Sequence, residues 1–251
     1  IYIKYINYMT LIKHTSQKAT KLYQLSYNQE KILIKVRKNK LSKSYKLTFD
    51  KKDLCGLVSI PRHISYKDGL KFADENLKWL ISQIEQFDPI IIIKDNIKIN
   101  FAGEEKIIKF INSKKVKVED NKKEITIYCK EGSHSKVLFK WIKNQILIHS
   151  NIIIERLSKK LSVKINKVKI TNSFSYWGSC NSKNEISINW RLIFCPEKIL
   201  EYIIAHELCH LLEFNHSKKF WKLVDSIIDK RLDSQKWLKK NDNYMYRIRM
   251  N

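Results

Sequence analysis

The sequence predicts an α+β fold in which a β-rich N-terminal region precedes a more helical domain. Apolar and polar residues alternate over much of residues 23–60, whereas apolar residues recur at helical spacing over 135–161 and again after Pro196. A period of two is typical of half-buried strands, and a spacing of three or four is typical of helices. We therefore expect a β-rich region with one helix over residues 20–130, and a second domain over 131–240.

In the N-terminal region, the alternation is clearest over residues 32–36 and 45–49. Ser65 stands three residues before Asp68, an arrangement that caps helix N-termini, and a helical pattern continues from there to Pro89. Further strands are expected at 97–101, 107–111, 116–118 and 125–127, with turns at Gly103 and at Asp120-Asn121.

In the second domain, the pattern from 135 to 161 predicts one long helix. A hairpin is expected next, with Val168 and Ile170 on one arm, Ile186, Ile188 and Trp190 on the other, and a turn at 181–184. Ser187, Asn189 and Arg191 then share the opposite face of the second arm. Pro196 is expected as the first residue of a helix that carries apolar residues to Leu212.

The composition is that of a folded, strongly basic protein. The chain has 251 residues, and its 49 Lys and Arg against 25 Asp and Glu give a formal charge of +24. Such a charge suits an acidic partner such as nucleic acid. Most of the basic residues are Lys, however, and a sequence rich in Ile, Lys and Asn is typical of an AT-rich genome, so the charge is weak support for nucleic acid as a partner.

The cysteines and the hydropathy pattern indicate a cytoplasmic protein. The five Cys form no CxxC pair, so neither a disulfide framework nor a zinc ribbon is predicted. The Ile-rich stretch at 90–93 is broken by Lys94 and Asp95, so no membrane-spanning segment is expected. Residues 1–10 match no signal peptide, and Met9 is a candidate start. The sequence indicates no oligomeric state.

The helix after Pro196 contains a motif that predicts a metal site. His206 and His210 are four residues apart, so their imidazoles lie on one face of the helix, one turn apart. Imidazole is a preferred zinc ligand, and catalytic zinc sites keep three protein ligands and one open position. Glu207 adjoins the first ligand, where a general base is needed to activate water.

His216 is predicted to be the third metal ligand. It follows His210 at the spacing of an extended HExxHxxGxxH motif, but Glu213 occupies the position of the Gly that ends the helix in that motif. Asn215 tolerates a left-handed conformation, so we expect it to turn the chain back. Glu213 is the rival ligand if the helix continues.

The other histidines and Cys209 lack comparable spacing. We expect surface or packing positions for His14, His63, His134 and His149, and Cys209 is interpreted as a small core residue.

Several motifs, in this order, resemble the YgjP-like metal-dependent hydrolases. These motifs are Trp177-Gly178-Ser179-Cys180, Asn189-Trp190-Arg191-Leu192, His206-Glu207-Leu208-Cys209-His210, Asn215-His216-Ser217 and Phe220-Trp221. The resemblance extends from about Tyr23 to Leu238. It implies a zincin-like metallopeptidase domain with an HExxH active-site helix, related to the WLM group of DNA–protein crosslink proteases, acting on a peptide or protein.

The chain departs from this family at Tyr176, where an Arg usually precedes the Trp-Gly-Ser-Cys segment. A role of that Arg in binding substrate or an anion is therefore not expected of Tyr176. Gly178 indicates a close approach of the backbone to another group. Arg191 is predicted either to polarise a carbonyl or clamp an anion, or to form a salt bridge.

Three functions remain open at this point. The first is a Zn²⁺ metallopeptidase with His206, His210 and His216 as ligands and Glu207 as base. The second is a metal-dependent hydrolase of nucleotides or other phosphorylated small molecules, which the excess of Lys favours. The third is a nucleic-acid-binding protein with a structural metal, which Glu207 argues against, because structural zinc sites need no base.

Overall fold

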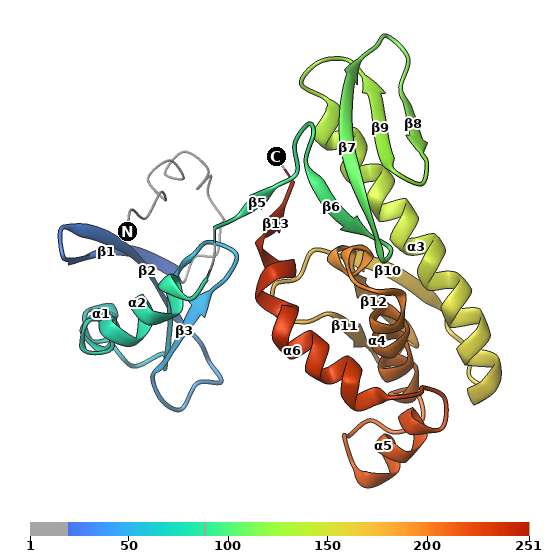
Figure 1. Cartoon of the computed structure of the whole chain (residues 1–251). Coiled ribbons are helices and arrows are strands. Elements are labelled where there is room, and N and C mark those ends of the chain that lie inside the picture. The colour runs from blue at the N-terminus through green and yellow to red at the C-terminus, as the bar shows by residue number, and fades with distance from the viewer. Residues whose placement is uncertain (1–19, 88, 251) are drawn as a thin grey trace. The chain divides into compact units, whose positions relative to one another are not determined.

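The computed structural model describes residues 20–87 and 89–250, and the chain divides into two compact units, Ile1–Phe87 and Asp88–Asn251 (Figure 1). The candidate start Met9 and His14 lie outside the described residues. Among the described helices, none is both long and apolar enough to cross a membrane.

Within residues 20–87, the first unit contains one four-stranded sheet and two helices. Its elements are β1 (Thr20–Tyr27), β2 (Glu30–Lys38), β3 (Lys46–Asp50), β4 (Cys55–Ile60), α1 (Tyr66–Glu75) and α2 (Leu77–Glu85). The strand order is β1-β2-β4-β3, with β2 and β4 parallel and the other pairs antiparallel. Ile34, Val36, Val58 and Ile60 alternate along β2 and β4 and form a small core with residues of α1 and α2, as a period of two requires.

The helical segment of the first unit begins as predicted but is interrupted. Ser65 caps α1 by accepting a hydrogen bond from the Asp68 backbone N–H at 3.1 Å. The single helix predicted up to Pro89 is wrong, because the chain leaves helical geometry at Asn76, which separates α1 from α2. The Asn76 side chain donates to the Phe72 carbonyl at 2.8 Å and its backbone N–H bonds to Ala73. These local bonds compete with the regular helical pattern.

The second unit is larger and contains three sheets. Its strands are β5 (Ile91–Ile92), β6 (Lys98–Phe101), β7 (Glu104–Asn112), β8 (Lys117–Asp120), β9 (Glu124–Cys129), β10 (Lys167–Thr171), β11 (Gly178–Cys180), β12 (Glu185–Asn189) and β13 (Ile248–Arg249). Its helices are α3 (His134–Leu161), the short 3-10 helix η1 (Trp190–Phe194), α4 (Glu197–Cys209), α5 (Lys218–Asp225) and α6 (Arg231–Arg247).

The long helix α3 joins two of these sheets into one core (Figure 1). It packs on β9 of the sheet β6-β7-β9-β8 and also on β10, α4 and η1. Ala102 and Gly103, both with positive φ, form the two-residue turn between β6 and β7. Because these strands share a core with α3, the compact units divide at 87/88, earlier than the domain boundary expected at 130/131.

The predicted hairpin over 168–194 is wrong in its pairing. β10 runs parallel to β12, and the antiparallel partner of β12 is β11, which gives the order β10-β12-β11. The chain reverses twice, once between β10 and β11 and once at Asn181–Asn184, so β10 and β12 point the same way. The second arm ends at Asn189, where the Asn189 side chain accepts from the Arg191 N–H and starts η1.

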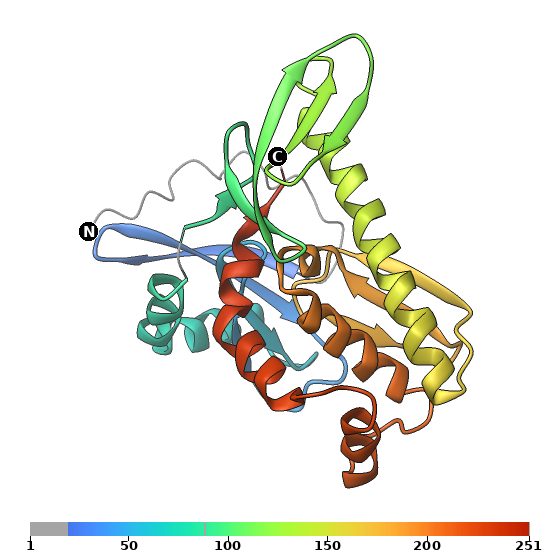
Figure 2. The same ribbon diagram turned by 45° about the vertical axis from the view of Figure 1, so that its right-hand side comes forward.

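Helix α4 lies between these layers, next to β11, β12, α3 and α6 (Figure 2). Nine of its residues are buried, including Ile199, Ile204 and Leu208. Pro196 is the N-cap rather than the first helical residue. Because α4 is packed on several sides, the residues at its C-terminal end have fixed positions.

Candidate metal centre

The C-terminal turn of α4 presents two imidazoles to one point. His206 lies in the last turn of the helix and His210 caps its end. The Nε2 atoms of these two side chains are 3.2 Å apart. The i, i+4 spacing therefore brings both rings to one side of the helix, as predicted.

His216 reaches the same point from the loop that follows α4. The helix ends through a tight turn, in which the backbone N–H groups of Leu212 and Glu213 both bond to the Cys209 carbonyl. His216 Nε2 then lies 3.0 Å from His206 Nε2. Asn215 does not have the left-handed conformation predicted for it. Its side chain instead accepts a hydrogen bond from the Ser217 N–H at 3.1 Å, so an Asx turn redirects the chain.

The three imidazoles fit a tetrahedral metal ion. Their ligand atoms lie within 4.8 Å of one another, and residues 20–87 and 89–250 contain no other such trio of His, Cys, Asp or Glu. On a tetrahedral ion with Zn–N distances of 2.0–2.1 Å, two ligand nitrogens are about 3.3 Å apart. The 3.2 and 3.0 Å separations are close to that value. Glu213, the rival ligand, instead directs its carboxylate to Lys219 at 3.6 Å.

The environment of the histidines favours the neutral form that binds metal. Burial, followed by the charges of His210 and His216, lowers the pKa of His206 to about 4. Burial also lowers the pKa of His210. The Nδ1 of His210 lies 3.2 Å from the Glu213 carbonyl oxygen. Because a carbonyl only accepts, Nδ1 carries the proton and Nε2 keeps its lone pair.

Glu207, which adjoins His206 in the sequence, has no polar partner among the described residues. Its side chain is 6% exposed, and no hydrogen bond or ion pair engages it within the described part of the chain. Burial raises the pKa of Glu207 to about 7. A buried carboxyl without a partner is costly in a purely structural position and is common at catalytic sites.

Gly178 on β11 provides the space that Glu207 occupies. A Cβ atom at this position would lie 2.7 Å from Glu207 Oε1 and 2.9 Å from Ile203 Cγ2. The predicted close approach at Gly178 is therefore to the side chain of Glu207. Cys180, two residues along the same strand, also lies near enough for Glu207 to raise the pKa of its thiol, although burial is the larger cause.

Gly178→Ala is expected to destabilise the protein by about 1–3 kcal/mol, the usual cost of overpacking, because Ile203 and Glu207 must both shift. Unfolding in denaturant measures this change. Ser179→Ala is the matched control, since successive residues of a strand point to opposite faces. Equal stability of the two variants would show that Gly178 is not closely packed.

The metal-free protein is expected to lose stability between pH 5 and pH 8 through Glu207. The folded-state pKa of about 7 lies above the ordinary value of 4.5 for a Glu side chain. The folded state therefore binds the proton more tightly, and this stabilisation disappears as the pH rises through that window. The difference in unfolding free energy between wild type and Glu207→Gln should change by roughly 2–3 kcal/mol from pH 5 to pH 8. A difference that is constant with pH would contradict the raised pKa.

Arg191 does not have either of the roles predicted for it. It is 1% exposed, and it donates to the Ile248 carbonyl at 3.1 Å and to Asn172 Oδ1 at 2.7 Å. Its guanidinium also lies over the rings of Phe174 and Trp190. Arg191 therefore ties η1 to the C-terminal strand β13, and burial lowers its pKa to about 9.

The remaining candidates pack as the sequence predicted. Cys209 is fully buried in the core. His134 stacks on Phe110 and lies 3.0 Å from the Ile111 carbonyl oxygen. The sequence did not reveal Tyr202, whose ring lies edge-on to His206, or Arg231 and Gln235, which contact Trp221 and Tyr202 next to the histidines. Arg231 and Gln235 lie on α6, so no local pattern links them to α4, and the spacing of Tyr202 before His206 on α4 is that of an ordinary core residue.

Comparisons with known proteins give one match that covers most of the chain. The profile of a family described as YgjP-like, metallopeptidase domain, matches residues 43–241. No curated protein matches the chain.

Two solved structures show a partial likeness. One is the metallopeptidase zymogen abylysin of Pyrococcus abyssi, which is 19% identical, with 37% of this chain and 95% of that chain covered and a TM-score of 0.34. The other is the metallopeptidase zymogen jannalysin of Methanocaldococcus jannaschii, which is 24% identical, with 38% and 96% covered and a TM-score of 0.33. With TM-scores this low, neither likeness bears on the site or its chemistry.

Proposed function

Because this chain belongs to the YgjP-like metallopeptidase family, we propose that His206, His210 and His216 hold a zinc ion and that Glu207 is the general base of peptide-bond hydrolysis. As a family member, the chain is a metal-dependent, peptidase-like hydrolase. The observation that carries the residue assignment is the convergence of three Nε2 atoms at the end of α4, together with the buried carboxyl of Glu207 on the same helix, which has no partner among the described residues.

The chemistry follows from these side chains. A zinc ion bound by the three histidines supplies Lewis acidity, which polarises a carbonyl group and makes water more acidic. Glu207 takes the proton from the attacking water and delivers it to the leaving amine. Burial raises the pKa of Glu207 in the metal-free protein, and the charge of a bound zinc ion would favour the carboxylate, the form that takes a proton from water.

An edge strand beside Glu207 supports a peptide as substrate. In the described part of the chain, β11 pairs with β12 on one side only. An extended peptide can add to such an edge through backbone hydrogen bonds. Because Gly178 lacks a side chain, a peptide on β11 lies close to Glu207.

The loop that carries His210 and His216 also favours polypeptide over nucleotide. Phe214, between the two ligands, is 78% exposed, and Leu212 is exposed as well. These apolar side chains suit an unfolded polypeptide. Arg231 lies over Trp221, which contacts His216. Its guanidinium already donates hydrogen bonds to Asp225 and Gln235, so few of its N–H groups are left to bind a phosphate.

A substrate panel tests the proposal. Zinc-loaded protein is incubated with an unfolded protein, a DNA-crosslinked protein and a nucleoside triphosphate. We expect cleavage of polypeptide that stops with a chelator and returns with added zinc. Hydrolysis of the nucleotide without any cleavage of polypeptide would replace the proposal with the phosphorylated-substrate alternative.

A further inference from the structure

His216 is the least constrained of the three histidines. The Nδ1 atoms of His206 and His216 have no hydrogen-bond partner among the described residues, whereas the Nδ1 of His210 is held by the Glu213 carbonyl. His206 is fixed by its position inside α4, but His216 lies in an exposed loop. Apart from the other two histidines, its ring contacts are with Trp221, stacked at a centroid distance of 5.6 Å, and with Phe220, edge-on at 4.9 Å. The orientation of His216 therefore depends on aromatic packing.

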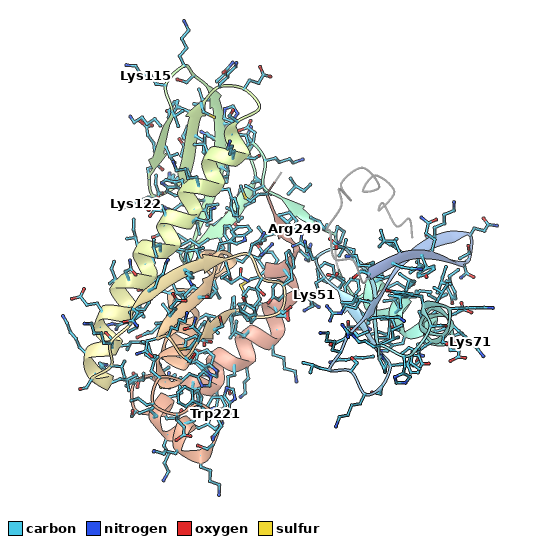
Figure 3. The ribbon with its side chains drawn as sticks, turned by 180° about the vertical axis from the view of Figure 1, so that it is seen from behind. Lys51, Lys71, Lys115, Lys122, Trp221 and Arg249 are labelled. Carbon is cyan, nitrogen blue, oxygen red and sulfur yellow. The ribbon has the colours of Figure 1, made fainter. Side chains whose placement is uncertain are left out.

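Trp221 in turn is held by Arg231 at the start of α6. The Arg231 guanidinium carbon lies 4.6 Å from the centre of the indole ring. Figure 3 labels Trp221 at the end of the second unit where α5 lies. A cation over the face of a Trp ring is attracted by the electron density of that ring.

The guanidinium itself is fixed at three points. Arg231 donates to Asp225 through Nε at 2.6 Å and Nη2 at 3.3 Å, and its Nη1 donates to Gln235 Oε1 at 3.2 Å. Its side chain is only 16% exposed. A planar, two-point contact of this kind restricts Arg more than a single ion pair does.

Gln235 also connects Arg231 to the surroundings of His206. Gln235 donates to the Tyr202 hydroxyl at 3.0 Å, and the Tyr202 ring lies edge-on to His206 at 6.1 Å. Arg231 of α6 is thus connected, through neighbouring side chains, to His216 in the loop before α5 and to His206 in α4.

We propose that Arg231 is a positioning residue of the metal centre, which raises metal affinity by fixing His216 through Trp221. The proposal rests on the proposed function, because it takes His216 as a ligand. An imidazole that is already oriented loses less conformational freedom on binding an ion than one that rotates in a loop. Removing a group that orients a ligand typically weakens metal affinity 10–100-fold.

Zinc titration of the purified full chain against a competing chromophoric chelator tests this role. Arg231→Met keeps the length of the side chain and removes its charge and its hydrogen bonds, and we expect zinc affinity to fall at least about tenfold. Arg156→Met is the matched control, since Arg156 also forms an ion pair, with Glu201 of α4 at 2.7 Å. Equal affinities in the two variants would overturn the proposal.

A double-mutant cycle separates positioning from a general effect on the fold. If Arg231 acts mainly through His216, Arg231→Met should cause a much smaller loss of zinc affinity in a His216→Ala background than in the wild type. An equal loss in both backgrounds would overturn the proposal. If His216→Ala by itself leaves zinc affinity unchanged, the ligand assignment fails instead, which is a different result.

Asp225→Asn provides a milder variant should Arg231→Met fail to fold. It removes the counter-charge of Arg231 and leaves every aromatic ring in place. We expect a smaller fall in zinc affinity, which shrinks further in the His216→Ala background. If Asp225→Asn is folded by circular dichroism and its zinc affinity equals that of the wild type, the proposal that Arg231 positions His216 is overturned.

Discussion

Glu207→Gln is expected to keep the metal and to lose at least about a hundredfold in turnover, the lower end of the contribution of a general base. Gln has nearly the same shape as Glu, so the close packing against Gly178 is preserved. It cannot take up a proton, however, so water is no longer activated by the protein. Turnover of polypeptide and zinc content, measured on the same preparation, give the result.

Glu201→Gln is the matched control for this variant. Glu201 lies on the same helix and pairs with Arg156, away from the histidines. We expect it to retain nearly wild-type turnover, because removing an exposed ion pair costs little. Near-normal turnover in Glu207→Gln would remove Glu207 from the mechanism and reopen the other two functions.

His216→Ala is expected to weaken zinc binding by more than the roughly 10–100-fold that loss of a supporting residue costs. Two histidines then remain, and a two-point site holds zinc poorly. Because His216 is exposed, the unfolding free energy of the metal-free protein should change by no more than about 0.5 kcal/mol. Zinc titration and denaturant unfolding of the metal-free protein measure the two effects separately.

Glu213→Ala tests the rival ligand. Its carboxylate pairs with Lys219, and its backbone carbonyl, which contacts His210, is unaffected by the substitution. Zinc affinity should therefore remain close to wild type. The opposite pattern, with affinity retained in His216→Ala and lost in Glu213→Ala, would show that the third ligand is Glu213.

Sequence reasoning was most accurate where the signal is local. The cap at Ser65, the long helix α3 and the Gly103 turn each depend on residues within a few positions of one another. The HExxH spacing brings His206 and His210 together for the same reason, since one helical turn fixes their geometry. The match to residues 43–241 is consistent with the order of the motifs along the chain.

Errors arose where distant segments decide the outcome. Alternation along 168–170 and 186–188 shows that both are strands, but it contains no information on the direction of pairing, and the reversal before β11 made them parallel. The sequence shows that residue 191 is an Arg, but not whether its guanidinium forms a salt bridge, binds an anion or donates to a buried carbonyl such as that of Ile248. Its surroundings alone distinguish these cases.

The sequence by itself determined that this protein carries two helical histidines with an acid beside them, and a third histidine within reach, because such spacing is a property of the local backbone. Only the tertiary structure decided how that set is completed. It placed the edge strand with Gly178 against Glu207, turned the loop so that His216 meets His206 without a left-handed Asn215, and brought Arg231 from α6 onto Trp221. Each of these contacts joins two different segments of the chain, and the packing between those segments, which no local pattern encodes, sets their geometry.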